Sequence, residues 1–412
     1  MVICNARILK DWSSTPFEGF LRIENGKIVE IGRKTDVCDI DLEGKLIIPG
    51  FFNTHTHAPM SLLKGISDDE PFDTWLFKKV LPVENKLTEE MIYWGTILAQ
   101  MEMVRRGIVA FVDMYFKEEW VAQAVADFGM KAVLTRGLVG DERDDGGRLR
   151  ENLALFEKWH ESHGGRIKIG FGPHSPYLCT PGYLRKIFDV ASFNDAIVTM
   201  HILETKKERR MYRLEDLLKL GMSKVKMIAV HCVYMEESEM KEAKKAFSFY
   251  ISHNPSSNLK LGNGVPKVHE MMKNELIVSL GTDGSASNNS LDIWHEMRLA
   301  ALIQKLRNPK FLPSKTVFKI ATFNGAVAMG FEKSGKVVEG FDADIVVVDT
   351  KKPHYYPEID LISNLVHAGN SGDVFATMVN GEWLYYDGKF LKVEEEQVYK
   401  KVEEIKDKIL SI

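Results

Sequence analysis

The feature that most constrains this chain is an alternation of apolar, strand-like runs with helical stretches through its middle. Such alternation implies an α/β fold with a parallel sheet and helices outside it. Eight strand–helix units, counting the run that ends in His55 and His57, predict a closed (β/α)₈ TIM-like barrel with its chemistry at the carboxyl ends of the strands. The other seven strands are expected at Ile108–Met114, Ala132–Val139, Ile167–Gly172, Ala196–His201, Met227–His231, Phe247–His253 and Leu276–Thr282. Helical stretches between them include Glu89–Arg106, Glu118–Phe128, Arg148–His163, Pro181–Phe193 and Leu291–Leu306.

The two ends of the chain follow a different pattern. Residues 1–48 read as short strands separated by turns, with a hairpin signal at Asn25-Gly26. Near the other end, Lys336–Gly340, Ala343–Asp349 and Ala376–Tyr386 also read as strands, the last of them around a second Asn-Gly pair.

Strand-rich ends around a different middle predict one small β domain built from both termini. We expect this β-sandwich to combine residues 1–48 and 333–412, beside a catalytic barrel of residues 49–332. The stretch from Val393 to Ile412 is predicted to be a charged amphipathic helix docked on the body.

Length and charge limit the alternatives. A chain of 412 residues fits a barrel-sized domain plus a smaller one. The net charge of -4 is near neutral for this size, which gives no sign of a nucleic-acid or membrane surface. The N-terminus lacks a signal-peptide pattern and no long uncharged apolar run exists, so we expect a cytoplasmic location.

The four cysteines, Cys4, Cys38, Cys179 and Cys232, are scattered and include no C-x-x-C pair. We therefore expect free thiols, mostly in the core. The same spacing argues against the His/Cys/Cys zinc site of cytidine-type deaminases, which requires P-C-x-x-C.

Histidines end several of the predicted strands. Successive side chains of a strand point to opposite faces, so His55 and His57 share a face and can hold one zinc-sized ion. One histidine at the end of an apolar strand is usually a core residue, but histidines at five strand ends of one barrel indicate a metal site. The later strands end in His174, His201, His231, His253 and Asp283.

This constellation resembles the amidohydrolase superfamily. The resemblance spans nearly the whole chain, because the split β domain is also a family feature. Its marks in this sequence are His55-x-His57, His201, His231 and Asp283.

The resemblance implies a single metal ion. Members with two ions usually bridge them with a carboxylated lysine or an acid at the end of strand four, where residues 171–174 read Phe-Gly-Pro-His. One divalent ion per subunit would then be held by His55, His57, His201 and Asp283. Zinc suits imidazole and carboxylate ligands, while iron, nickel and manganese stay open.

Glu204 lies three residues after His201, and this His-x-x-Glu resembles the mononuclear deaminase branch of the superfamily. Deamination of an aminopurine requires a proton on the ring nitrogen, attack by hydroxide and a proton on the leaving amine. The resemblance implies that Glu204 protonates the ring nitrogen and shuttles the proton onward. It implies that Asp283 accepts a proton from the attacking water, and that His231 orients this water and stabilises the charge on its oxygen.

Longer stretches look like the S-adenosylhomocysteine/methylthioadenosine deaminases. The implied reaction is metal-dependent hydrolysis of the adenine 6-amino group of these nucleosides, with adenosine as a further candidate, to the inosyl product and ammonia. The matching stretches are Asn53–Met60, Trp75-Leu76, Val80–Glu84, Phe111–Tyr115, Asp144–Leu149, Phe171–Tyr177, Ser252–Gly264 and Gly281–Asn289.

The resemblance also implies a substrate pocket. Glu84 would accept hydrogen bonds from both ribose hydroxyls, because a carboxylate offers paired acceptors, and His174 would contact the sugar. Arg136 and Arg148 would hold the carboxylate of the homocysteine tail. Trp75 would pack on the nucleoside or its thioether. The implied substrate-binding set also includes Glu204 and Asp283.

Two alternatives stay open. The first is another amidohydrolase reaction, such as deamination of guanine, cytosine or a triazine, but a free base would leave Glu84 and the two arginines without a purpose. The second is a non-catalytic scaffold, which would be expected to lose the metal set that is complete here. The expected partner is a small adenine nucleoside, with no nucleic acid and no membrane, and a homo-oligomer is left open.

Overall fold

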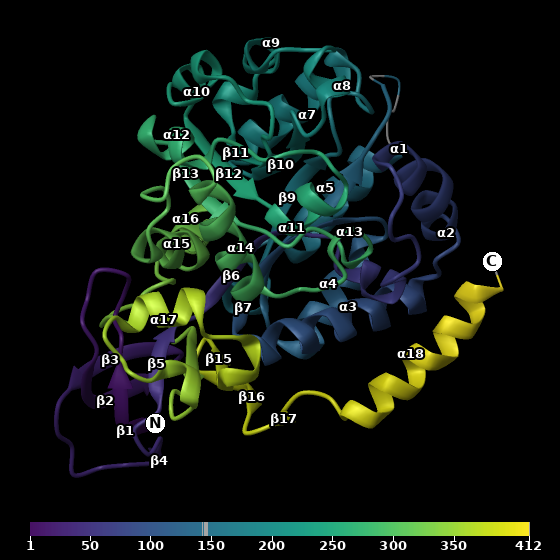
Figure 1. Ribbon diagram of the computed structural model, residues 1–412. Coiled ribbons are helices and arrows are strands. Elements are labelled where there is room, and N and C mark those ends of the chain that lie inside the picture. Colours follow the sequence, from purple (N-terminus) through teal and green to yellow (C-terminus); the bar gives the residue numbers. More distant parts are fainter. Residues whose placement is uncertain (142, 144–146, 412) are drawn as a thin grey trace.

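The computed structural model describes residues 1–141, 143 and 147–411 and contains two sheets (Figure 1). The first sheet has eight strands in the order β13-β12-β11-β10-β9-β8-β7-β6, and each pairs in parallel with the next along the chain. Every residue of β6 and β7 is buried, as expected for a parallel sheet covered on both faces. The eight strands are β6 (Phe51–Thr56), β7 (Ile108–Tyr115), β8 (Lys131–Leu138), β9 (Ile167–Pro173), β10 (Ile197–Ile202), β11 (Lys226–His231), β12 (Ser248–His253) and β13 (Ile277–Leu280).

Helices surround these strands (Figure 1). Local signals set their ends: the Thr180 side chain caps the start of α7 by accepting from the Tyr183 N–H, and Gly129, with φ of 97°, ends α4. The longer helices are α3 (Glu89–Arg105), α4 (Glu118–Phe128), α5 (Arg148–Trp159), α7 (Pro181–Phe193), α9 (Leu214–Lys219), α10 (Glu237–Ala243), α12 (Val268–Lys273), α14 (Ile293–Lys305), α15 (Ser314–Ala321) and α16 (Phe323–Ala328). Shorter ones are η1 (Ala58–Leu63), α1 (Phe72–Thr74), η2 (Trp75–Val80), α2 (Leu81–Glu84), α6 (Ser162–Gly165), α8 (Lys206–Arg209), η3 (Met222–Lys224), α11 (Pro255–Lys260) and α13 (Ser285–Asn288).

The second sheet takes strands from both ends of the chain. Its order is β17-β16-β15-β14-β5-β1-β2-β3, with β4 beside β1, and the antiparallel pair β5–β14 joins the two ends. It encloses an apolar core of its own, which includes Ile3, Leu21 and Ile345. The strands are β1 (Val2–Ile8), β2 (Phe17–Glu24), β3 (Lys27–Gly32), β4 (Ile40–Asp41), β5 (Leu46–Pro49), β14 (Ile345–Val348), β15 (Val374–Val379), β16 (Glu382–Tyr386) and β17 (Lys389–Phe390).

These two sheets confirm the predicted fold class, a (β/α)₈ barrel with a small β domain built from both termini. Both Asn-Gly hairpins are also confirmed, because Asn25-Gly26 and Asn380-Gly381 have positive φ at both positions, as a type I′ turn requires. The domain boundaries and the cytoplasmic location stay predictions. Within the described ranges, every helix is too short or too polar to cross a bilayer.

Two predicted elements differ from the structure. Lys336–Gly340 forms no strand, since Val337 and Gly340 each donate one backbone hydrogen bond to a different segment and make no ladder. The helix that begins at Arg148 ends at Trp159, and Glu161 follows with φ of 56°. The other predicted strand and helix ends lie within two residues of those observed.

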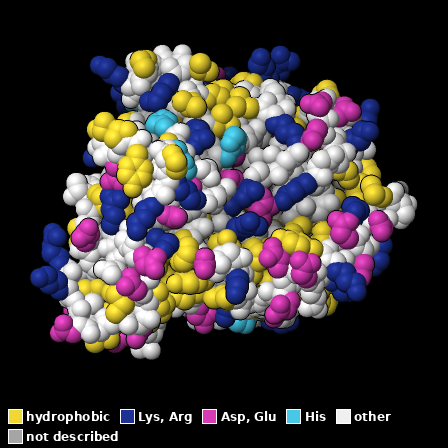
Figure 2. Space-filling view, turned by 60° about the horizontal axis from the view of Figure 1, so that its bottom comes forward, with side chains coloured by type: hydrophobic (Ala, Val, Ile, Leu, Met, Phe, Trp, Pro, Cys, Tyr) yellow, Lys and Arg dark blue, Asp and Glu magenta, His cyan; other side chains and the backbone are white. Residues whose placement is uncertain are grey.

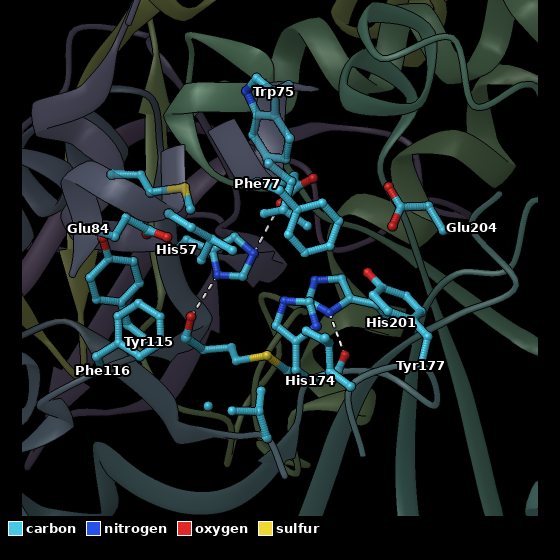
Figure 3. Close-up of a pocket in the computed structure, with 18 of the residues that line it drawn as sticks. His57, Trp75, Phe77, Glu84, Tyr115, Phe116, His174, Tyr177, His201 and Glu204 are labelled. Atoms are coloured by element: carbon cyan, nitrogen blue, oxygen red, sulfur yellow. Dashed lines mark hydrogen bonds and ion pairs between the residues drawn. The ribbon is translucent and has the colours of Figure 1, made fainter. Parts of the chain in front are cut away.

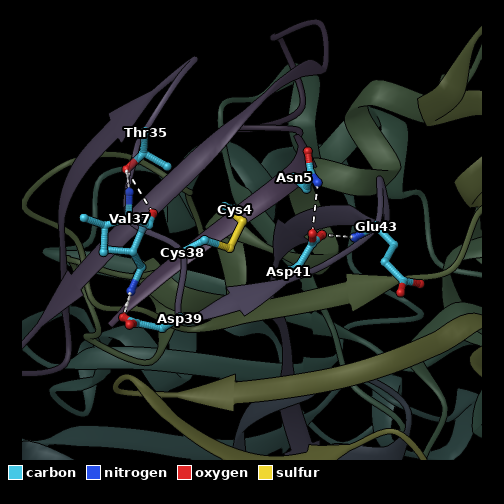
Figure 4. Close-up of a disulfide and its surroundings, with 9 residues drawn as sticks. Cys4, Asn5, Thr35, Val37, Cys38, Asp39, Asp41 and Glu43 are labelled. Atoms are coloured by element: carbon cyan, nitrogen blue, oxygen red, sulfur yellow. Dashed lines mark hydrogen bonds between the residues drawn. A yellow bond between two sulfur atoms is a disulfide. The ribbon is translucent and has the colours of Figure 1, made fainter.

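The expectation of four free thiols is wrong. Cys4 and Cys38 form a disulfide with their Cα atoms 5.6 Å apart, while Cys179 and Cys232 are free and buried (Figure 4). The pairing follows from the sheet: β4 lies parallel to β1 with Ile40 opposite Ile3, which brings the residue two before β4 beside Cys4. Because 34 positions separate the cysteines, spacing alone gave no sign of the bond.

The C-terminal part covers the barrel from outside. α17 (Leu361–His367) and the short turns η4 (Pro353–Tyr355) and η5 (Ser371–Asp373) precede β15, and the chain ends in α18 (Glu395–Leu410), which Figure 1 shows beside α3. Val398, Ile405 and Ile409 form the buried stripe of α18. On the face drawn in Figure 2, Lys and Arg side chains lie interspersed with Asp and Glu side chains.

A buried ion network joins the barrel to the small sheet. The Nζ atom of Lys131, at the start of β8, lies 2.5 Å from Asp344, 2.8 Å from Asp342 and 3.1 Å from the Ser334 hydroxyl. Lys131 is 1% exposed and Asp344 is fully buried. Asp344 also accepts the backbone N–H of Asn380 at 2.8 Å, so this carboxylate links three segments.

Candidate active site

Four residues that are far apart in the sequence meet at the carboxyl end of the barrel. His55 and His57 lie at the end of β6, His201 lies in β10, and Asp283 follows β13. Nε2 of His55 and Nε2 of His57 lie 3.2 and 3.3 Å from the same oxygen of Asp283. The ring centroids of His55 and His201 are 4.9 Å apart.

The surroundings of these imidazoles fit metal ligands. Nδ1 of His57 contacts the Met114 carbonyl at 2.6 Å and Nδ1 of His201 contacts the His174 carbonyl at 2.7 Å. A carbonyl can only accept, so each Nδ1 carries the hydrogen and leaves Nε2 as a lone pair. Within the described chain neither ring nitrogen of His55 makes a hydrogen bond, although the residue is fully buried.

The electrostatics of this cluster favour positive charge at its centre. Burial lowers the pKa of His57, but its contact with Asp283 outweighs burial and raises the pKa to about 9. Burial and the neighbouring imidazoles hold the pKa of His201 well below its ordinary value. Several lone pairs that converge on one carboxylate repel each other unless a cation lies between them, so the donor set fits a divalent ion. Two overlapping groups of side chains have ligand atoms close enough to share an ion, His55 with His57 and Asp283, and His55 with His201 and His231.

Two further polar residues stand beside the ligands. Oε1 of Glu204, just after β10, lies 3.6 Å from Nε2 of His231, the last residue of β11. Burial, followed by the charge of Asp283, raises the pKa of Glu204 well above its ordinary value. Burial lowers the pKa of His231 to about 4, so this imidazole is neutral.

Three of the four candidate ligands, His57, His201 and Asp283, line one cavity of 440 Å³ together with the predicted pocket residues. Figure 3 shows Glu84 and Glu204 on opposite sides of the group formed by His57, His174 and His201. Glu84 lines this cavity and is 5% exposed, and its Oε1 is buried without a hydrogen-bond partner within the described residues. Burial raises the pKa of Glu84.

The other predicted pocket residues reach the same cavity from neighbouring elements. Trp75 is fixed by a 3.1 Å hydrogen bond from its indole N–H to the Ala286 carbonyl. Arg136, in β8, donates from Nε to Glu151 at 2.8 Å, and Nη1 of Arg148, at the start of α5, donates to the Val139 carbonyl at 3.2 Å. Residues 144–146 of the matching stretch Asp144–Leu149 lie outside the described residues.

The loop after β12 contributes residues to which the sequence reasoning gave no role. The Asn263 side chain donates to Oε1 of Glu204 at 2.7 Å, and Oδ1 of Asn258 lies 2.9 Å from Nδ1 of His231. The Ser257 hydroxyl donates to Oδ2 of Asp283 at 2.6 Å. All three fall inside Ser252–Gly264, so the match of that stretch was the available signal.

A model of the amidohydrolase family matches residues 46–384. The chain belongs to the amidohydrolase family. This amidohydrolase is 53% identical over 411 residues, and over the full length of both chains, to a Thermotoga maritima protein named 5-methylthioadenosine/S-adenosylhomocysteine deaminase. It is 38% identical over 411 residues to a Methanosarcina mazei protein named 5'-deoxyadenosine deaminase, covering 96% of this chain and 94% of the relative.

A solved structure gives the same result. The crystal structure of an adenosine deaminase from Xanthomonas campestris with bound zinc superposes on this amidohydrolase with a TM-score of 0.92 and 26% identity, covering 100% of this chain and 99% of the other. The predicted family is confirmed, and so is the prediction of an enzyme. The chain is a hydrolase that acts on carbon–nitrogen bonds.

Proposed function

We propose that this amidohydrolase removes the 6-amino group from the adenine of S-adenosylhomocysteine, methylthioadenosine and adenosine, with water as the second substrate. One observation carries the proposal: a single cavity is lined by His57, His201, Glu204 and Glu84, and Oε1 of Glu84 has no hydrogen-bond partner among the described residues. The relatives named as deaminases of 5'-substituted adenosines support it.

His55, His57, His201 and Asp283 would hold one divalent ion, for which we propose zinc. Zinc at such a site supplies Lewis-acid chemistry by lowering the pKa of water toward about 7. The chain's own residues then determine where the protons go. Asp283 accepts the first proton of the attacking water. Burial acts to raise the pKa of Asp283, but its contacts with the two imidazoles of the His-x-His pair keep the pKa well below its ordinary value.

Glu204 is the proton donor in this proposal. Burial raises the pKa of Glu204 and so favours its protonated form, which can protonate the ring nitrogen next to the attacked carbon. His231 carries a hydrogen on Nδ1, facing Asn258, so its Nε2 accepts from the attacking water and orients it. Because Glu204 supplies the proton on the ring nitrogen, one proton of water goes to the departing amine, which leaves as ammonia, and the other returns Glu204 to its protonated form.

The pocket residues would hold the rest of the nucleoside. The free acceptor of Glu84 suits the vicinal diol of ribose, and His174 would contact the sugar. Trp75, held by its indole hydrogen bond, would pack on the nucleoside or its thioether. The guanidinium groups of Arg136 and Arg148 suit the carboxylate of the homocysteine tail.

A panel of substrates tests this function. The purified enzyme, loaded with Zn²⁺, is incubated with S-adenosylhomocysteine, methylthioadenosine, adenosine, guanine and cytosine, and ammonia is measured. We expect release from the three adenine nucleosides, together with the absorbance change from adenine to hypoxanthine. Release from the free bases alone would refute the substrate assignment, and no release with no bound transition metal would favour a scaffold.

The ribose assignment has a separate test. Removing a charged hydrogen-bond acceptor from a diol loses roughly 1.5–3 kcal/mol, so Glu84→Ala should lower kcat/KM for methylthioadenosine about 10- to 100-fold. Glu89→Ala is the matched control, since Glu89 is an exposed glutamate in the first turn of α3. Equal rates for the two variants would remove Glu84 from the ribose site.

A further inference from the structure

Arg136 stands between two cavities. It lines the 440 Å³ substrate cavity, and it also lines a second cavity of 670 Å³ on its outer side. Glu84 and Phe116 line both cavities as well. Glu151 lines the outer cavity. Among the described residues, Arg136 and Arg148 line the substrate cavity, and Glu151 does not.

On its outer side the Arg136 guanidinium already has a partner. Nε donates to a carboxylate oxygen of Glu151 at 2.8 Å, and Nη1 donates to the Gly137 carbonyl. The side chain of Arg136 is 13% exposed, whereas that of Glu151 is 59% exposed. The cation proposed to receive the carboxylate of a substrate therefore already holds a carboxylate of the protein.

Helix α5 places this carboxylate beside both arginines. Arg148 is the first residue of α5 and Glu151 is the fourth, and residues three apart are neighbours on a helix surface. A carboxylate that approaches Arg136 and Arg148 from the substrate cavity thus comes under the field of Glu151. Like charges repel over this range unless solvent screens them, and on the cavity side the Arg136 side chain is mostly buried.

Glu151 could orient Arg136 or compete for it. The Gly137 carbonyl already fixes the guanidinium, so orientation does not depend on Glu151. Competition is the larger effect, because Glu151 neutralises part of the charge that a second carboxylate needs. A nucleoside with an uncharged 5' substituent does not depend on the charge of Arg136 and is not repelled by Glu151.

We propose that Glu151 is a specificity-determining residue that weakens selection for adenine nucleosides with a carboxylate in the 5' substituent. It acts through Arg136 and keeps nucleosides with uncharged 5' substituents competitive at the same site. The inference rests on the function proposed above.

The homocysteine tail also carries an ammonium group, which a carboxylate could bind directly. Arg136 lies between Glu151 and the substrate cavity, so the geometry favours an effect on the carboxylate of the tail. An adenosine 5'-thioether that ends in propionate has the carboxylate and no amine. It therefore distinguishes an effect of Glu151 on the carboxylate from direct binding of the ammonium group.

The test compares Glu151→Gln with Glu157→Gln. Glu157 is an exposed glutamate six residues further along α5, so both variants remove one negative charge from the same helix. For each enzyme, kcat/KM is measured with S-adenosylhomocysteine, with the thiopropionate nucleoside and with methylthioadenosine. Thermal unfolding and metal content confirm that each variant is folded and loaded.

We expect both carboxylate-bearing substrates to gain about fivefold in kcat/KM relative to methylthioadenosine in Glu151→Gln, and no change of either ratio in Glu157→Gln. Unchanged or lower ratios in Glu151→Gln would overturn the inference. A loss confined to S-adenosylhomocysteine would also overturn it and assign Glu151 to the ammonium. If the wild-type enzyme deaminates none of the three nucleosides, the proposed function fails and this inference fails with it.

Discussion

Replacing Lys131 by methionine is expected to destabilise the protein strongly. The substitution keeps most of the side-chain volume and removes the charge, which leaves Asp344 fully buried without its cation. Breaking a buried ion pair by removing one partner typically costs about 3–5 kcal/mol, because the remaining charge has no compensation.

The expected shift in melting temperature follows from the size of the chain. At about 2.1 cal/mol/K per residue, 412 residues unfold with an entropy of roughly 0.9 kcal/mol/K. A loss of about 4 kcal/mol then lowers Tm by about 5 °C. Differential scanning calorimetry at fixed pH and metal content measures this shift.

The same network supplies a matched control. Lys27 contacts the other oxygen of Asp342 at 3.0 Å, but its side chain is 54% exposed. Exposed pairs contribute about 0–1 kcal/mol, so Lys27→Met should lower Tm by no more than about 1 °C. Lys131→Met combined with Asp344→Asn should recover part of the loss, because the uncompensated charge is then absent. Equal shifts for the two single variants would refute the reasoning.

Three further predictions concern the site and the small domain. Asn263→Ala frees Oε1 of Glu204, so we expect kcat for methylthioadenosine to fall about tenfold with KM unchanged, and a rise in KM alone would contradict this. Burial raises the pKa of Glu296 from 4.5 to about 7, so the folded state loses about 3 kcal/mol of stability as pH rises through that window. The Tm of Glu296→Gln minus that of the wild type should therefore increase between pH 4.5 and 7, and a constant difference would argue against a protonated carboxyl group. Reducing the Cys4–Cys38 bond frees a 34-residue loop, worth about 4 kcal/mol in the chain-entropy model, so Tm should fall by about 4 °C with reductant and remain unchanged by reductant in Cys4→Ser.

The barrel, and the meeting of the candidate ligands at one end of it, could be predicted because their signals are local. An apolar run that ends in a polar residue marks the carboxyl end of a parallel strand, and the barrel brings all such ends to one face. His55, His57, His201 and Asp283 therefore meet, although 228 positions separate the first from the last. A correct prediction of the fold class was therefore enough to predict that these four side chains converge.

The contacts that tune the site are not local, and residue spacing does not predict which side chains make them. Asn263 reaches Glu204 across 59 positions, and Glu151 reaches Arg136 across 15 positions and from a different element. The Cys4–Cys38 bond depends on strand register in the small sheet, which spacing does not reveal. Such contacts are fixed by side-chain packing in three dimensions, which a linear pattern of residues does not encode.

Hydrogen bonds connect the first strand of the barrel, β6, to the residues that follow its last strand, β13. Asn53 in β6 exchanges two hydrogen bonds with Thr282, at 2.7 and 2.9 Å, and the Asp283 N–H donates to the His55 carbonyl at 2.9 Å. An ion bound by His55 and Asp283 would also link these two strands and help to hold the barrel closed. A newly synthesised chain could then retain the ion only after β6 and β13 had come together. Binding of the ion would therefore report that the barrel has closed.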